Sequence, residues 1–100
     1  MSIEEYIINQ MHWSLSTFGA GARTEGICRH IEEEVNEIRE NPSDVEEWVD
    51  VMILAIDGAW RAGYDSEQIM DALKVKQAKN FTRRWPGHQP QDHPTKHIEE

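Results

Sequence analysis

The sequence has a single cysteine, no long apolar run and no basic leader. Because Cys28 is alone, no internal disulfide can form, and a cytosolic protein with a buried thiol is predicted. No apolar stretch reaches the roughly 18 residues of a membrane span. The first residues, MSIEEY, lack the basic flank and apolar core of a signal peptide. We therefore expect a cytoplasmic protein with no membrane partner.

Positive charge is also scarce, with 10 basic residues against 19 acidic ones and a net charge of −9. Contacts with phosphates supply most of the affinity of proteins for nucleic acids, so this charge argues against a nucleic acid polymer as a partner. Half of the basic residues nevertheless lie close together after the most acidic part of the chain: Lys74, Lys76, Lys79, Arg83 and Arg84. An acidic segment that can hold cations, followed by a basic one, suits a small polyphosphate ligand.

The pattern of apolar residues predicts an all-α protein. A chain of 100 residues, 38% hydrophobic and 29% charged, is long enough for one domain with a modest core. Four segments have helical spacing and none indicates a strand; the predicted helices cover residues 2–14, 24–40, 43–62 and 65–84. Between the first two lies a glycine-containing loop, from Phe18 to Thr24. Residues 1–85 form the predicted domain, and residues 86–100 a polar, proline-containing tail.

Short connections between the helices predict how they pack. Capping-box patterns mark three helix starts: Ser2 with Glu5, Ser43 with Glu46, and Asp65 with Gln68. The loop of about three residues after Glu40 forces the second and third helices into an antiparallel hairpin. The third helix is apolar nearly all round, and one chain of this length has too little material to surround it. We therefore predict a four-helix bundle completed by homo-oligomerisation, as a homodimer or homotetramer.

Ten of the nineteen carboxylates lie in the hairpin, between His30 and Asp57. At about 100° per residue, and with Ile27 at zero, Glu34 falls near −20°, inside the apolar stripe, and Glu37 lies on its flank near −80°. On the third helix, Glu47 and Asp50 lie about 60° apart on one face. Each helix thus presents two carboxylates three residues apart, and the hairpin can turn one pair toward the other.

Four carboxylates in a confined, partly apolar site repel one another and lose hydration, so they need compensation. Divalent cations supply it, and an oxygen-only ligand set suits Mg²⁺ or Mn²⁺ better than Zn²⁺. Acidic helices are often simply solvated, but two such pairs aimed at apolar surface favour a metal site. A buried ion-pair network is the structural alternative. Between residues 32 and 57, however, Arg39 is the only basic residue.

The last predicted helix changes from apolar to basic along one face. Lys76, Asn80 and Arg83 continue the stripe of Ile69 and Leu73, within about 40° of Ile69. Cations beside bound metal ions would repel them unless an anion lay between, and a nucleoside triphosphate is such an anion. The alternative is that basic residues complement the dipole of the helix C-terminus, which we prefer for Lys79 and Arg84.

Two residues before the glycine-containing loop are candidates for contact with a nucleobase. Trp13 offers a ring for stacking and Ser14 a polar edge. Trp13 is equally consistent with a place in the core, so both interpretations remain open for it.

Several runs of the sequence resemble a known family. Glu33-Glu34-x-x-Glu37 followed by Glu47-x-x-Asp50 resembles the EExxE…ExxD signature of the MazG-like all-α nucleotide pyrophosphohydrolases. Three longer runs are similar to the phage-associated dATP/dGTP diphosphohydrolase (MazZ-like) family: WSLSTFGAGARTEGICRHIEEEVNEI, EEWVDVMILAIDGAWRAG and KVKQAKNFTRRWP. The resemblance covers about residues 12–98.

The resemblance implies hydrolysis of a purine deoxynucleoside triphosphate, dGTP or dATP, to the monophosphate and pyrophosphate, which remodels the nucleotide pool. The family's metal ligands fall on Glu34, Glu37, Glu47 and Asp50, and Glu33 completes the motif from outside the apolar stripe. If the chain is phage-encoded, its location is the host cytoplasm.

The expected mechanism uses two or three Mg²⁺ ions to activate water and to neutralise the phosphates, with Glu34 or Glu37 accepting the proton of the water. Lys76 and Arg83 are expected to hold the outer phosphates. One alternative is a pyrimidine substrate, dUTP or dCTP. Another is a non-catalytic helical adaptor whose acidic face docks a basic partner.

Overall fold

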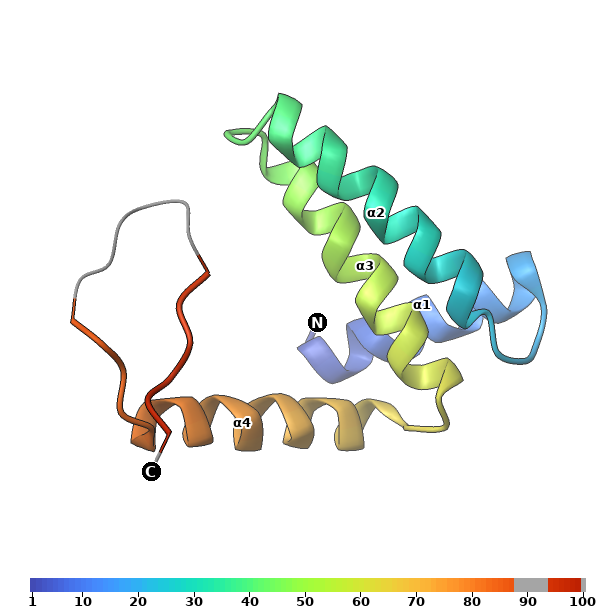
Figure 1. Ribbon diagram of the computed structural model, residues 1–100. Coiled ribbons are helices and arrows are strands. Elements are labelled where there is room, and N and C mark those ends of the chain that lie inside the picture. Colours follow the sequence, from blue (N-terminus) through green and yellow to red (C-terminus); the bar gives the residue numbers. More distant parts are fainter. Residues whose placement is uncertain (88–93, 100) are drawn as a thin grey trace. The chain divides into compact units, whose positions relative to one another are not determined.

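The computed structural model describes residues 1–87 and 94–99, and the regular structure in them is helical (Figure 1). Four helices follow one another: α1 (Ile3–Phe18), α2 (Thr24–Glu40), α3 (Val45–Arg61) and α4 (Ser66–Thr82). The described residues contain no strand, only an isolated bridge between Arg84 and Ile98. The prediction of an all-α protein with four helices is confirmed. Part of the predicted tail, residues 88–93 and 100, lies outside the described residues.

Helix α1 begins where the sequence predicts but continues one turn further than Ser14. The Ser2 hydroxyl accepts a hydrogen bond from the backbone N–H of Glu5 at 3.1 Å, which caps the first turn. Residues 15–17 contain no helix breaker, so the helix continues to Phe18. Gly19 then adopts a φ of 87°, and its N–H donates to the Leu15 carbonyl at 2.9 Å. Glycine takes this positive φ at little cost, and it ends the helix.

Helices α2 and α3 form the predicted hairpin, side by side along most of their length (Figure 1). The predicted range of α2 is confirmed at both ends. The predicted cap of α3 is wrong, because Asp44 rather than Ser43 caps it, accepting from the Glu46 N–H at 3.0 Å. Asp and Ser are equally good caps, so a Ser-Asp pair leaves the start of a helix uncertain by one residue.

The connection between α3 and α4 contains a glycine turn and the predicted capping box. Gly63 has a φ of 109° and its N–H donates to the Trp60 carbonyl at 2.9 Å, which closes the last turn. Asp65 and Gln68 form a complete capping box: the Gln68 N–H donates to the Asp65 carboxylate at 2.8 Å, and the Asp65 N–H donates to the Gln68 side chain at 3.0 Å.

The chain forms two compact units, residues 1–70 and 71–100. In the first unit, α3 packs against both α1 and α2, as expected for the central helix. Its core is small: the buried hydrophobic residues among those described are Ile7 and Ile27. The predicted domain boundary at residue 85 stays a prediction. No helix in the described part of the chain is long and apolar enough to cross a membrane.

Two surface features bear on earlier expectations. Cys28 is exposed, so the prediction of a buried thiol is wrong; it follows Ile27 by one residue and is therefore turned about 100° away from the buried stripe. On α3, exposed apolar side chains recur at helical spacing, at Val45, Trp48, Val49 and Met52, which are 38 to 69% exposed. By helical geometry this apolar stripe lies roughly opposite Glu47 and Asp50.

Candidate functional site

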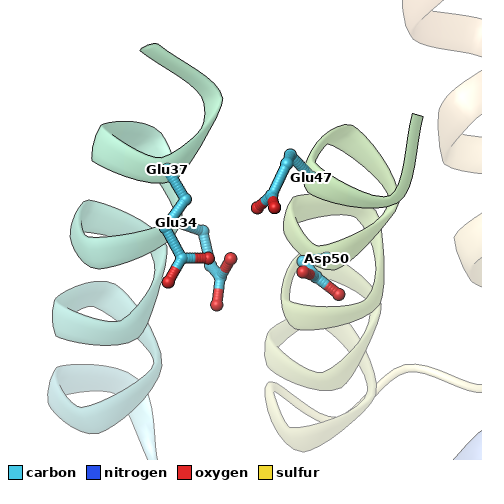
Figure 2. A group of neighbouring side chains, drawn as sticks. All are labelled: Glu34, Glu37, Glu47 and Asp50. Atoms are coloured by element: carbon cyan, nitrogen blue, oxygen red, sulfur yellow. The ribbon is translucent and has the colours of Figure 1, made fainter. Parts of the chain in front are cut away.

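Four carboxylates converge between α2 and α3. Glu34 and Glu37 project from α2 toward Glu47 and Asp50 on α3 (Figure 2). One oxygen from each residue lies within 4.8 Å of the others. The hairpin produces this arrangement because each pair is spaced by three residues and so lies on one face of its helix. We call these four residues the acidic cluster.

The acidic cluster is partly removed from water. Glu34 is buried, with 8% of its surface exposed, Glu47 and Asp50 are half-buried, and Glu37 is exposed. The Glu34 Oε2 and Glu47 Oε2 atoms are enclosed without a hydrogen-bond partner among the described residues. The neighbouring Glu37 side chain, together with burial, raises the pKa of Glu34. Burial, followed by the proximity of Glu37, raises the pKa of Glu47.

Basic groups around the acidic cluster do not neutralise it. The His30 Nε2 atom lies 3.1 Å from Glu34 Oε1, an ion pair only when the imidazole is protonated. Arg39 instead donates to the Asn36 side chain at 3.2 Å. Four carboxylates with two enclosed, unpaired oxygens match the oxygen ligand set of a hard divalent cation such as Mg²⁺ or Mn²⁺. The acidic cluster can therefore bind a metal ion.

A cavity of about 220 Å³ opens beside the acidic cluster, within residues 1–70. Its lining follows one face of α2 and one face of α3 away from the cluster, over Glu34, His30, Ile27 and Arg23, and over Asp50, Leu54 and Asp57. Helix α1 adds Gln10, Trp13, Ser14 and Phe18. The cavity thus extends from two carboxylates of the acidic cluster, Glu34 and Asp50, to the aromatic rings of Trp13 and Phe18.

Comparison with known families decides the reaction class. A model of the dATP/dGTP pyrophosphohydrolase family matches residues 6–100. The chain belongs to this family. It is therefore a nucleoside triphosphate diphosphatase, an enzyme rather than an adaptor. Searches of curated proteins and of solved structures give no match.

The two residues predicted to contact the base, Trp13 and Ser14, differ in their exposure to solvent. Trp13 is 57% exposed, so it is not a core residue, and its ring packs edge-on against Phe18 at the cavity. Ser14 also lines the cavity but is 1% exposed. Its hydroxyl donates to Asp57 Oδ1 at 2.6 Å and accepts from Arg61 at 2.9 Å. Its hydrogen is thus committed within the protein.

Sequence reasoning missed a buried ion pair behind the cavity. Arg61, with 2% of its side chain exposed, lies 3.1 Å from Asp57 Oδ1 and donates to the carbonyls of Gly19 and Gly21 at 2.9 and 2.8 Å. It thus connects α1, the loop after it and α3. A signal for this pair is present in the sequence, because Asp57 and Arg61 are four residues apart on one helix and can therefore meet.

The basic residues predicted to bind phosphate belong to the second unit, described by itself. The Arg83 guanidinium donates to Asn80 Oδ1 at 3.1 Å, and the Asn80 amide is 3.3 Å from the Gln77 side chain. Lys76 is exposed. Asn80 near the end of α4 and Arg83, the first residue after it, therefore contact each other.

Proposed function

We propose that the enzyme hydrolyses dGTP, dATP or both to the monophosphate and pyrophosphate, with Mg²⁺ held by the acidic cluster. One observation carries the proposal: two enclosed, unpaired carboxylate oxygens lie in a four-carboxylate cluster of a chain from this family. Such oxygens destabilise the fold, and a bound cation would offset that cost. This supports a metal-bound state of the site.

Glu34, Glu37, Glu47 and Asp50 are the proposed metal ligands. Two or three Mg²⁺ ions, or Mn²⁺ in their place, supply an activated water and offset the charge of the phosphates when bound. Glu34 and Glu37 are the proposed catalytic residues, because either can accept a proton from the attacking water. Glu37 is the exposed member of the cluster, and Glu34 is the most enclosed one.

The substrate is proposed to lie with its triphosphate at the acidic cluster and its base toward Trp13. The exposed ring of Trp13 is available for stacking, and Ser14 is proposed to act at the same end of the cavity. From the charge pattern of the sequence, we further propose that Lys76, Asn80 and Arg83 contact the outer phosphates. Replacing Lys76 with alanine should then raise the KM for dGTP, whereas Lys74→Ala should not.

We also propose that the enzyme is a homodimer or homotetramer in the cytoplasm, where it remodels the nucleotide pool, and that it belongs to the phage-associated, MazZ-like branch. The apolar stripe on α3 supports the oligomer, because such patches on a small protein usually mark an interface. The net charge of −9 supports a small substrate rather than a nucleic acid polymer.

The proposal is tested by incubating the purified protein with dGTP and dATP in the presence of Mg²⁺ or EDTA. The expected products are the monophosphate and pyrophosphate, with Mg²⁺ only. Release of two inorganic phosphates, or full activity of Glu37→Ala or Asp50→Ala, would contradict it. Including dUTP and dCTP tests a pyrimidine substrate, which membership of the dATP/dGTP family disfavours.

A further inference from the structure

Asp57 is a buried carboxylate of the cavity that the acidic cluster does not include. It lies on α3 seven residues after Asp50, about 10 Å along the helix axis. Only 7% of its surface is exposed, yet it lines the same cavity as Trp13 and Asp50. A nucleotide with its phosphates at the acidic cluster would place a more distal part, the sugar or the base, at Asp57.

Hydrogen bonds hold one oxygen of Asp57 and leave the other available. Ser14 Oγ, Trp60 Nε1 and Arg61 Nε all donate to Oδ1, at 2.6, 2.8 and 3.1 Å. Within residues 1–87 and 94–99, no hydrogen bond reaches Oδ2. The enclosed, unpaired side-chain oxygens of this part belong to Glu34 and Glu47, not to Asp57. The Oδ2 atom is therefore not fully enclosed, and Asp57 lines the cavity.

The same contacts keep Asp57 ionised. Burial alone raises the pKa of Asp57, but hydrogen bonds from Ser14, Arg61 and Trp60, with the charge of Arg61, outweigh it and hold the pKa below its usual value. An ionised carboxylate only accepts hydrogen bonds. The ligand group that meets Oδ2 must therefore be a donor.

We propose that Asp57 Oδ2 accepts hydrogen bonds from the Watson–Crick edge of a guanine, so that Asp57 sets the base preference of the enzyme. The inference rests on the proposed function, because it needs the triphosphate at the acidic cluster. Guanine presents two adjacent donors on this edge, N1–H and the 2-amino group. Adenine presents an unprotonated N1, whose lone pair would face the carboxylate. The enzyme then prefers dGTP to dATP.

Ser14 and Arg61 act through Asp57 as positioning residues. Both bind Oδ1 and each other, which fixes the direction of the carboxylate. This explains how Ser14 contributes to recognition of the base although its hydrogen is already committed. Trp13, exposed at the same cavity, remains available for stacking on the base.

The decisive experiment uses the unmodified enzyme with dGTP, dITP, dATP and 7-deaza-dGTP. Inosine lacks the 2-amino group, so kcat/KM should fall about tenfold with dITP, and about a hundredfold with dATP, as for lost hydrogen bonds to a charged group. The 7-deaza analogue keeps the Watson–Crick edge and should match dGTP. Equal kcat/KM for dGTP and dITP would overturn the proposal. If kcat/KM instead falls with 2′,3′-dideoxy-GTP, which lacks the 3′-hydroxyl, and not with dITP, then Asp57 binds the sugar.

Variants provide a second test with a readout other than stability. Ser14→Ala keeps the ion pair but frees the carboxylate to turn, so the ratio of kcat/KM for dGTP and dITP should fall toward one. In Asp57→Asn an amide donor can face N1 of adenine, and the ratio of dATP to dGTP hydrolysis should rise. Asp71→Asn, an exposed aspartate outside the cavity, is the control and should change neither ratio. Unchanged ratios in Ser14→Ala would count against the proposal.

Failure of the proposed function can be distinguished from failure of the inference about Asp57. No hydrolysis of any nucleotide with Mg²⁺ would defeat the role of the acidic cluster. Calorimetry with dGMP and dIMP would still test Asp57, because both ligands present the base. Tighter binding of dGMP, lost in Ser14→Ala, supports the inference, and equal binding of the two contradicts it.

Discussion

At the scale of single residues, the carboxylates of the acidic cluster that suit a metal ion destabilise the metal-free protein. Glu34 and Glu47 each have an enclosed oxygen without a hydrogen-bond partner among the described residues, and their pKa values are raised. In the metal-free protein these carboxylates face like charges across the hairpin. The acidic cluster is therefore a place where removing a charge helps the fold and harms the reaction.

Replacing Glu34 or Glu47 with glutamine should make the metal-free protein at least as stable as the wild type, because repulsion is relieved. Activity should fall about a hundredfold or more, because a metal ligand is lost. An activity assay measures the second effect. Thermal denaturation with EDTA and with Mg²⁺ measures stability and metal binding, and the rise in Tm on adding Mg²⁺ should disappear. Glu32→Gln, an exposed position on α2, is the control. An unchanged response to Mg²⁺ in Glu34→Gln would exclude Glu34 as a ligand.

The raised pKa values also predict how stability depends on pH. Above pH 4.5, the unperturbed pKa of Glu34 and Glu47, the unfolded state loses protons that the folded state still holds. The metal-free protein should therefore lose stability as pH rises from 4.5 through the raised pKa values. Urea denaturation in EDTA at several pH values tests this, and the slope should vanish in the Glu34→Gln, Glu47→Gln double variant. Asp57 acts oppositely: its lowered pKa stabilises above pH 3.8, and this is lost on stronger acidification.

At the scale of helices, the sequence predicts what short-range patterns determine. The range of α2 is confirmed because its stripe of apolar residues specifies it. The Asp65–Gln68 capping box is confirmed because its two residues lie three apart in the sequence. The convergence of the acidic cluster also follows from periodicity and one short loop. The hydrogen bond from Arg61 to the Gly19 carbonyl joins residues 42 apart in the sequence, so no local sequence pattern predicts it.

Two ion pairs with the same four-residue spacing test the role of burial. Arg61→Met leaves Asp57 buried without its partner and should lower the free energy of unfolding by about 3 to 5 kcal/mol. Arg29 pairs with Glu25 at 3.0 Å with both side chains at least 75% exposed, so Arg29→Met should cost less than about 0.5 kcal/mol. Urea denaturation of both variants gives the comparison. Equal costs would mean that Arg61 does not hold the loop after α1.

Alanine substitutions at two helical glycines should have the same effect on stability but different effects on substrate binding. A methyl group meets no atom within 4 Å at Gly26, and at Gly58 it makes an ordinary contact of 3.8 Å with Ile27. Alanine at either position should stabilise the protein by about 0.5 to 1 kcal/mol, because glycine is the poorer helix former. Gly26 lines the cavity and Gly58 does not, so only Gly26→Ala should raise the KM for dGTP. A raised KM in both variants would indicate a general shift of the hairpin.

At the scale of the whole molecule, the proposed oligomer accounts for apolar surface that one chain leaves in water. The described residues include two buried hydrophobic residues, Ile7 and Ile27, whereas Val45, Trp48, Val49 and Met52 are exposed on α3. The sequence predicted that one chain is too short to surround the apolar third helix, because an apolar helix in a short chain is readily recognised. The number of copies is not encoded in such a pattern, since a dimer and a tetramer can cover the same stripe.

Met52→Glu should dissociate the proposed oligomer. Met52 is 58% exposed in the apolar stripe, roughly opposite the acidic cluster, so a charge there opposes association without touching a proposed metal ligand. Light scattering after size-exclusion chromatography should give the mass of a single 11.6 kDa chain for the variant and a multiple of it for the wild type. Glu46→Gln, an exposed polar change on the same helix, should keep the wild-type mass. A wild-type protein that already runs as one chain would refute the proposed oligomer. An oligomer that survives in Met52→Glu would place its interface elsewhere than on the apolar stripe.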